Sequence, residues 1–484
     1  MALFVYSVLP DQYLNEQGET VALSTTARAA AAVGLWMAIW WMTEAISVYA
    51  TALLPLALFP LTGVATIKLT ASSYGHEIIY LFLGGFILAL ALEKCGLHRR
   101  FAIRTLRLVG TRPAAIVGAF MAIAAFTSMW VTNTATTIML LPVAISVCQL
   151  ITANSEVSGD DAPWKNFSLC LFLGIAYAAS IGGVGTIVGT APNLFLVSFL
   201  NSQMNVDVSF VGWMKVGVPL VVVFVPLVWL SLCRFIYPVS RAKITGVGQL
   251  FDSLEAEIGR MSRAERRTLV IFLCTAGAWV TRPLLGKITI GGIAPLAGLS
   301  DPGIAVLAAL ALFVTPSGDG DSGFLMDWET AIRLPWGLLI LFGGGLSLAA
   351  GLQLTGFSEF LGTRTAILGN LPVFVIVAAL IALVIFLTEL TSNTATTATL
   401  VPIVYAVAIG LGIDPLLLVV PAGIAASCAF MLPVATPPNA IVFGSGMVSI
   451  AQMARAGLWL NLLGILLISL LTYAIIVPAL GVRI

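Results

Sequence analysis

Long apolar stretches follow one another along almost the whole chain, and they limit the possible folds more than any other feature of the sequence. About 20 apolar residues are enough to cross a bilayer as a helix, and in lipid only helices and closed barrels satisfy their own backbone hydrogen bonds. The stretches that we interpret as spans are 27–42, 44–64, 78–97, 168–200, 211–238, 268–285, 303–316, 335–355, 415–448 and 454–480. The pattern predicts an all-α polytopic protein of the cell (inner or plasma) membrane, with lipid around it.

The charge content agrees with this prediction. Charged residues make up 9% of the chain, whereas soluble domains carry about 25%. The net charge of +1 indicates no nucleic-acid partner. Cysteines and histidines are scattered without metal-ligand spacing, and no nucleophile–base set is evident, so we expect neither a metal cluster nor an enzyme. Segment 1–26 opens with an apolar stretch too short to span, and we interpret it as the end of a first helix.

Two nearly identical polar hexads interrupt the apolar sequence. TNTATT occupies 132–137, and SNTATT occupies 392–397. Each hexad lies near the centre of an apolar block, 113–153 or 371–411, that is long enough for two short helical arms. We interpret both blocks as re-entrant hairpins with the hexad at the bend. The alternative is a pair of ordinary spans joined by a turn at one membrane face.

The order of motifs around the hexads occurs twice. A glycine-rich span precedes each hairpin, YLFLGGFILALAL (80–92) in the first half and LLILFGGGLSLAA (338–350) in the second. A Thr-x-Pro-Asn element follows each hairpin, in GTAPN (189–193) and ATPPN (435–439). The chain therefore divides into an N-terminal segment 1–26, a first repeat 27–238, a cytoplasmic connector 239–267 and a second repeat 268–484.

Positive charges predict how the repeats are oriented. Segment 98–112 carries five arginines and no acidic residue, and segment 239–267 carries six basic residues. Short loops rich in Lys and Arg face the cytoplasm, so both segments are predicted to be cytoplasmic. Loop 357–372 corresponds to 98–112 in the second half, but three intervening spans place it on the opposite face. The repeats are therefore predicted to be inverted, as in many secondary transporters.

The Thr-x-Pro-Asn elements predict breaks within two of the spans. Proline and glycine in 182–193 and 428–439 favour unwound backbone. Such a break exposes N–H groups that attract anions and C=O groups that attract cations. The hexads add Asn and hydroxyl side chains, which both donate and accept hydrogen bonds. The two halves would together form one pocket, although similar polar groups in other membrane proteins only join helices.

The ligand of this pocket is constrained by what the motifs lack. No Lys, Arg or His lies close to them in the sequence. A doubly charged anion would then need neutral dipoles or co-bound cations, because a charge at mid-membrane costs at least about 2.5–3.5 kcal/mol. Coordination by oxygen alone suits a hard cation such as sodium.

The hexads and three flanking stretches resemble a known family. The hexads stand within SMWVTNTATT and TELTSNTATT, and the flanking stretches are WWMTEAI (40–46), LFLGGF (81–86) and LHRRFAIRTLRLVG (97–110). From about residue 30 to the C-terminus the chain is similar to the divalent anion/sodium symporters, or INDY-type transporters, which include sodium–dicarboxylate and sodium–citrate carriers. The resemblance implies a homodimer and an elevator-type transporter. Thr132 stands where the family usually has serine, which keeps the hydroxyl but adds a methyl group.

The resemblance also implies a set of site residues. Those implied for the anion are Thr132, Asn133, Thr134, Thr190, Ser392, Asn393, Thr394 and Thr436. One sodium ion would bind Ser128, Asn133 and carbonyls near Gly189, and a second would bind Thr388, Asn393 and carbonyls near Ala435. Glu389 is expected to bind nearby backbone amides, and the alternative is that it tunes the second cation site.

These inferences predict a secondary transporter rather than an enzyme. The predicted activity is sodium-coupled symport of C4-dicarboxylates such as succinate, malate and fumarate, with two or more sodium ions. The alternatives within the same fold are a sodium-independent dicarboxylate exchanger and a carrier of citrate or sulfate. A channel and an intramembrane hydrolase are the alternatives of other classes.

Overall fold

The computed structural model describes residues 6–14, 19–154, 162–241, 243–289, 294–318, 323–365 and 371–480. Within these ranges eight helices are long and apolar enough to cross a membrane, and five shorter apolar helices accompany them. The strands in the described ranges are the short antiparallel pair β1 (Gln12–Leu14) and β2 (Thr20–Ala22). The predicted all-α polytopic architecture is confirmed.

A group of helices precedes the glycine-rich helix of the first repeat. They are α2 (Thr25–Thr43), α3 (Val48–Thr51), α4 (Leu54–Thr62), α5 (Ile67–Ser72) and the 3-10 turn η1 (Ser73–Gly75). Residues 44–64, predicted as one span, form α3 and α4 instead, so that prediction is wrong. Pro55 stands in the first turn of α4, where its fixed φ and missing N–H favour the start of a new helix.

The two halves contain the same sequence of helices, and the second half ends with one further short helix. The first half has α6 (Glu77–Lys94), α7 (Leu97–Arg107), α8 (Pro113–Ser128), α9 (Asn133–Asn154), α10 (Ala162–Gly183), α11 (Ala191–Met204), α12 (Phe210–Leu230) and the π-helical turn η2 (Ser231–Ile236). The second half has α17 (Trp336–Leu354), α18 (Phe357–Thr365), α19 (Val373–Thr388), α20 (Asn393–Gly410), α21 (Leu416–Ala425), α22 (Pro437–Gly444), α23 (Ile450–Leu471), the π-helical turn η4 (Thr472–Ile476) and α24 (Val477–Leu480).

Backbone details also repeat. Each glycine-rich helix, α6 or α17, ends before a left-handed glycine, Gly96 at φ 75° or Gly356 at φ 76°. Residues that carry a side chain rarely adopt this left-handed backbone conformation. Each half then has a helical hairpin, α8–α9 or α19–α20, whose arms are joined by four residues. The repeat inferred from the motifs is therefore visible in the local structure.

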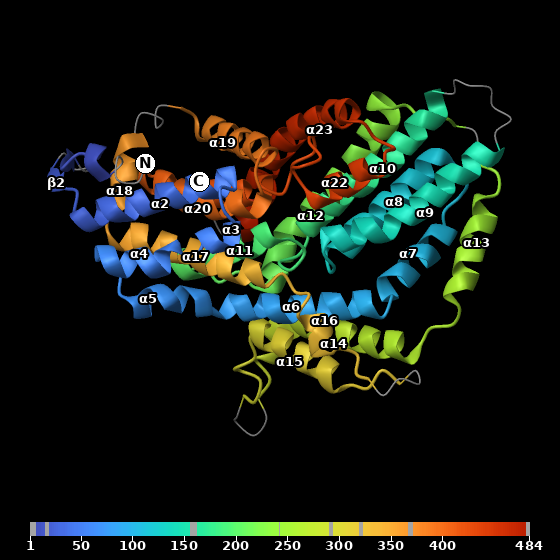
Figure 1. Cartoon of the computed structure of the whole chain (residues 1–484), viewed down its shortest axis with the longest axis horizontal. Coiled ribbons are helices and arrows are strands. Elements are labelled where there is room, and N and C mark those ends of the chain that lie inside the picture. Colours follow the sequence, from blue (N-terminus) through green and yellow to red (C-terminus); the bar gives the residue numbers. More distant parts are fainter. Residues whose placement is uncertain are drawn as a thin grey trace.

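The predicted helix breaks are present, and they join the two halves. Residues 184–190 separate α10 from α11, and residues 426–436 separate α21 from α22. The helix after each break packs against the hairpin of the other half, since α11 contacts α20, and α22 contacts both α9 and α10. Figure 1 shows α11 and α22 near the middle of the molecule, with α20 to their left and α9 and α10 to their right. These contacts between the two halves bring both hairpin tips and both breaks together.

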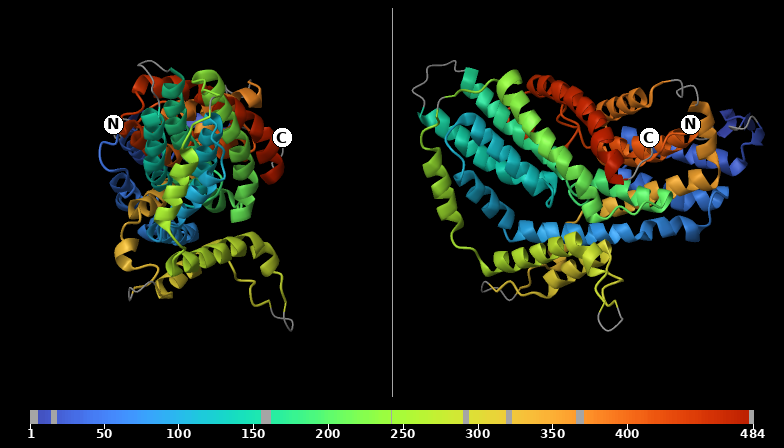
Figure 2. Two further views of the ribbon diagram at one scale, coloured as in Figure 1. Left: turned by 90° about the vertical axis from the view of Figure 1, so that its right-hand side faces the viewer. Right: turned by 180° about the vertical axis from the view of Figure 1, so that it is seen from behind.

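Between the halves lie α13 (Val247–Ile258), α14 (Arg263–Leu285), α15 (Asp301–Val314) and α16 (Trp328–Ala331). Helix α13 lies along α7, and α14 and α15 pack against α6 on the outside of the molecule (Figures 1 and 2). The Ile244 N–H donates to the Thr111 carbonyl at 2.8 Å, so the two basic segments lie on the same side, as the predicted orientation requires. The boundary drawn at residue 267 falls inside α14.

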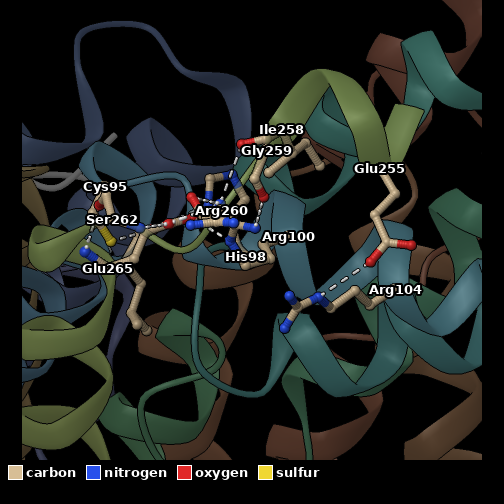
Figure 3. A network of polar contacts seen from close by, with 11 residues as sticks. Cys95, His98, Arg100, Arg104, Glu255, Ile258, Gly259, Arg260, Ser262 and Glu265 are labelled. Atoms are coloured by element: carbon tan, nitrogen blue, oxygen red, sulfur yellow. Dashed lines mark hydrogen bonds and ion pairs between the residues drawn. The ribbon is translucent and has the colours of Figure 1, made fainter. Parts of the chain in front are cut away.

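A buried ion pair fastens α7 to the segment that joins α13 to α14 (Figure 3). The Arg100 side chain is 5% exposed, and its Nε and Nη2 donate to the two carboxylate oxygens of Glu265 at 2.7 and 2.9 Å. The same guanidinium donates to the carbonyls of Ile258, Gly259 and Arg260 at 3.3, 2.7 and 3.1 Å. Glu265 also completes a capping box with Ser262 at the start of α14. One arginine therefore satisfies a buried carboxylate and three turn carbonyls.

Replacing Arg100 by alanine is expected to lower the free energy of unfolding by about 3–5 kcal/mol, because Glu265 would keep a buried charge without its partner. Arg104→Ala is the matched control, since Arg104 meets Glu255 at 3.6 Å on the exposed side of the same helix. Exposed pairs contribute about 0–1 kcal/mol. Unfolding followed in detergent measures both variants. Equal effects of the two substitutions would contradict the assignment.

Candidate functional site

A cavity of about 1250 Å³ lies where the hairpin tips and the helix breaks meet. Most residues predicted for the site line it, namely Thr132, Asn133, Thr134, Gly189, Thr190, Ser392, Asn393, Thr394, Ala435 and Thr436. Ser128 and Thr388 do not line it, but both are fully buried directly behind the tips. Residues far apart in the sequence thus surround one space, as the inference of a single pocket required.

The first tip and the first break form a cluster of oxygen atoms. The Ser128 hydroxyl donates to the Asn133 Oδ1 at 2.5 Å. A Cβ atom on Gly183 would lie 2.7 Å from that Oδ1 and 3.1 Å from the Gly189 carbonyl oxygen. The side chain of Asn133 therefore borders the backbone of the break, and only glycine at position 183 leaves room for this approach. Ser128, Asn133 and the Gly189 carbonyl lie together as predicted.

The second tip and the second break form a similar cluster. The Thr388 hydroxyl lies 2.8 Å from the Asn393 Oδ1 and 3.1 Å from the Ala426 carbonyl oxygen. A hydroxyl has one proton and can satisfy only one of these acceptors, so the cluster has spare lone pairs. The carbonyl that meets Thr388 belongs to Ala426, whereas the sequence pointed to carbonyls near Ala435. No sequence signal marks Ala426, because its role depends on where the helix unwinds.

Two buried asparagines hold the unwound segments in shape. The Asn193 side-chain amide donates to the carbonyls of Gly183 and Thr186 at 3.0 and 2.8 Å. Asn439 does the same in the second half, with the carbonyls of Ala429 and Leu432 at 3.3 and 3.1 Å. Both asparagines are the last residue of a Thr-x-Pro-Asn element, so the motif contained the signal for this role. They shape the site without lining the cavity.

Four helix N-termini point toward the cavity. Helices α9, α11, α20 and α22 all begin at residues that line it. Thr190 and Thr436 precede α11 and α22 with extended backbone, at φ −148° and −142°. Free N–H groups at helix N-termini and the aligned peptide dipoles favour a negative charge. The arrangement suits an anion, while the oxygen clusters of the two tips suit small hard cations.

Exposed charged residues also line the cavity, at Glu44, Glu93, Lys94 and Arg333. The sequence motifs did not indicate that Lys94 and Arg333 belong to the same cavity, because they stand on other elements. Lys94 forms an ion pair with Asp327. Lys94, together with the Thr330 N–H, lowers the pKa of Asp327 to about 2, so the Asp327 carboxylate keeps its charge throughout the physiological range.

Glu389 occupies the turn of the second hairpin and binds backbone amides, as expected. Its carboxylate accepts hydrogen bonds from the N–H groups of Phe430, Met431 and Leu432 at 2.7, 2.9 and 3.1 Å. The Asn461 amide of α23 donates to the same carboxylate at 2.8 Å. The second tip is therefore tied to the second break by a charged group.

Solved structures of similar fold are membrane transporters. The YdaH transporter of Alcanivorax borkumensis aligns with a TM-score of 0.62 and 16% identity, covering 97% of this chain and 94% of that chain. The efflux pump MtrF of Neisseria gonorrhoeae aligns with a TM-score of 0.59 and 11% identity, covering 97% and 96%. At these identities the likeness concerns the fold alone. Fold and cavity together define a multi-pass membrane protein with a cavity between its two halves.

The chain belongs to the family described as sodium:sulfate symporter transmembrane region, whose model matches residues 19–480. Curated relatives include the sodium-dependent dicarboxylate transporter SdcS of Staphylococcus saprophyticus subsp. saprophyticus, which is 40% identical over 454 residues, or 93% of this chain and 86% of the relative. SdcS of Staphylococcus aureus is 39% identical over 457 residues, or 94% and 86%. The family expected from the motifs is confirmed.

Proposed function

We propose that the protein is a sodium-coupled symporter of C4-dicarboxylates, such as succinate, malate and fumarate, in the cell membrane. One observation carries this proposal: a single cavity has an oxygen cluster at each hairpin tip and four helix N-termini around it. The names of the relatives, sodium-dependent dicarboxylate transporters, support the same ions and the same class of anion.

The geometry suggests how the anion is held. One carboxylate would accept hydrogen bonds from Thr132, Asn133 and Thr134 at the first tip, and the other from Ser392, Asn393 and Thr394 at the second. Thr190 and Thr436 would add hydroxyl donors at the ends of the breaks. These groups are neutral, and in a site of low dielectric such donors are worth more than in water. A C4-dicarboxylate has carboxylates at its two ends, which suits a cavity with one donor set in each half.

Sodium supplies the positive charge that the tips lack. One ion would bind Ser128, Asn133 and the Gly189 carbonyl, and a second would bind Thr388, Asn393 and carbonyls of the second break, with Ala426 added to those near Ala435. Two sodium ions neutralise a dianion and so reduce the cost of carrying it through lipid. Each asparagine serves both ligands, since its Nδ2 can donate to the anion while its Oδ1 coordinates sodium. This sharing is a direct physical route to coupling.

We further propose that transport occurs by an elevator motion of inverted repeats in a homodimer. The predicted orientation places Lys94 and Arg333 on the cytoplasmic side, which makes this an inward-open state. The reciprocal packing of α11 on α20 and of α22 on α9 supports movement of both hairpins and both breaks as one body. Tips that meet the breaks within the interior, rather than at a face, favour re-entrant hairpins over ordinary spans.

Uptake of labelled succinate into proteoliposomes tests the proposed function. Wild-type protein is expected to accumulate succinate only when an inward sodium gradient is imposed. Equal uptake without sodium, combined with a requirement for internal dicarboxylate, would show a sodium-independent exchanger instead. Competition by unlabelled malate, fumarate, citrate and sulfate then identifies the preferred anion, and stronger competition by citrate or sulfate than by the C4-dicarboxylates would contradict the assignment.

A further inference from the structure

The two hairpin tips repeat each other's contacts, but one of the differences between their sequences changes the charge. Ser128 and Asn133 in the first half correspond to Thr388 and Asn393 in the second, and both pairs are hydrogen-bonded. The residue after the hydroxyl is Met129 in the first tip and Glu389 in the second. A neutral side chain thus stands in one half where the other half has a carboxylate.

The first break holds itself together without a charged group. The N–H groups of Val184 and Gly185 donate to the carbonyls of Ile181 and Gly182 at 3.1 and 2.9 Å. The Gly189 N–H donates to the Thr186 hydroxyl at 3.1 Å. That hydroxyl donates to the Met129 carbonyl at 2.5 Å. The contact between tip and break in this half is therefore made by a hydroxyl and a backbone carbonyl.

The second break depends on the Glu389 carboxylate. It receives the three successive amides of 430–432 and the amide of Asn461. Glu389 is 3% exposed and Asn461 is fully buried. All these partners are neutral donors, and the ion pairs found in the described part of the chain do not include Glu389. Donors of this kind stabilise an ionised carboxylate, but they leave its negative charge uncompensated.

We propose that Glu389 is a positioning residue that gives the second sodium site its higher affinity, a proposal that rests on the proposed function. Glu389 directly follows Thr388 in the chain. Its carboxylate binds the amides of the second break, and the Ala426 carbonyl of the same break accepts a hydrogen bond from the Thr388 hydroxyl. A cation bound at Thr388 and Asn393 balances the charge of Glu389, whereas a cation at Ser128 and Asn133 has only Met129 in the corresponding position. The two sites are therefore unequal, and sodium fills the second site at lower concentration.

The test compares Glu389→Gln with Glu329→Gln, an exposed carboxylate on α16 that does not line the cavity. Succinate uptake is measured at increasing sodium concentration with the purified full-length proteins in proteoliposomes. For E389Q the half-saturating sodium concentration is expected to rise about tenfold, because the substitution removes a buried negative charge from the break that borders the cation site, and charges interact strongly where the dielectric is low. At saturating sodium the KM for succinate is expected to stay within about threefold of the wild-type value. E329Q is expected to match the wild type.

A purely structural role for Glu389 predicts another outcome. E389Q would then lower the maximal rate or the melting temperature while the sodium dependence stays unchanged, and this result would overturn the proposal. An equal shift in E329Q would also overturn it.

Glu389→Asp keeps the charge on a shorter side chain, and its half-saturating sodium concentration is expected to lie nearer the wild-type value than that of E389Q. If E389Q does not fold, E389D decides alone: a half-saturating sodium concentration about twofold higher with an unchanged maximal rate supports the proposal, and a lower maximal rate with unchanged sodium dependence contradicts it. Sodium-independent uptake by the wild type would reject the proposed function itself and so is a separate outcome.

Discussion

Alanine in place of Asn133 or Asn393 is expected to reduce sodium-driven succinate uptake by about 100-fold or more at subsaturating concentrations. Both side chains line the cavity, and their Oδ1 atoms accept from Ser128 and Thr388. A hydrogen bond to a charged group contributes about 1.5–3 kcal/mol, which is about 10- to 100-fold in affinity. Since each asparagine is proposed to serve both the anion and a cation, one substitution removes two such contacts.

Initial rates measured against both sodium and succinate concentration distinguish this effect from a simple loss of substrate affinity. Both half-saturating concentrations are expected to rise together, because the two ligands share the side chain. Asn201→Ala is the matched control, since Asn201 lies on α11 beyond the break and does not line the cavity. Wild-type uptake by the Asn393 variant would falsify the assignment of the second tip.

Gly189→Ala is expected to lower the rate of uptake by about 50-fold or more. It is also expected to lower the free energy of unfolding by about 1–3 kcal/mol. A Cβ atom at this position would overlap the Gly183 carbonyl oxygen and would lie 3.0 Å from the Gly183 carbonyl carbon and Cα. Backbone atoms cannot move aside as a flexible side chain can, so the break must widen. Widening displaces Gly183 from the Asn133 amide and the Gly189 carbonyl from the first oxygen cluster.

The control for this prediction is Gly277→Ala on α14, where a Cβ atom meets nothing within 4 Å. That substitution is expected to stabilise the helix by about 0.5–1 kcal/mol without changing uptake. Uptake and melting temperature of both variants are measured on the same preparations. Uptake by the Gly189 variant at the wild-type rate would show that the first break has room for a side chain. It would also show that transport does not need the close approach of Gly189 to the Gly183 backbone.

Most of the candidate site could be inferred from local sequence. The polar hexads, the glycines and the Thr-x-Pro-Asn elements act on their own backbone, because proline removes a donor and glycine allows close approach wherever they stand. The hairpin arms α8–α9 and α19–α20 end within a few residues of the predicted blocks 113–153 and 371–411. The roles of Asn193 and Asn439 were also accessible in principle, since both stand in the quoted motifs.

Contacts between distant segments could not be inferred in this way. Arg100 was one of several arginines in a basic segment, and only the packing of α7 against the connector shows that it is buried on Glu265. Lys94 and Arg333 reach the cavity from α6 and from the residues after α16. Sequence spacing carries no information about such neighbours, because they depend on how the helices cross.

The sequence by itself determined the class of fold, the repeat and the residues of the two tips, because apolar length, proline, glycine and polar hexads act locally. Only the tertiary structure decided how the two breaks differ. Gly189 and Ala435 occupy the same motif position, but a Cβ atom at Gly189 would meet the Gly183 backbone, whereas Ala435 carries a Cβ atom. The longer second break has space that the Glu389 carboxylate fills, and that space exists only once the helices have packed.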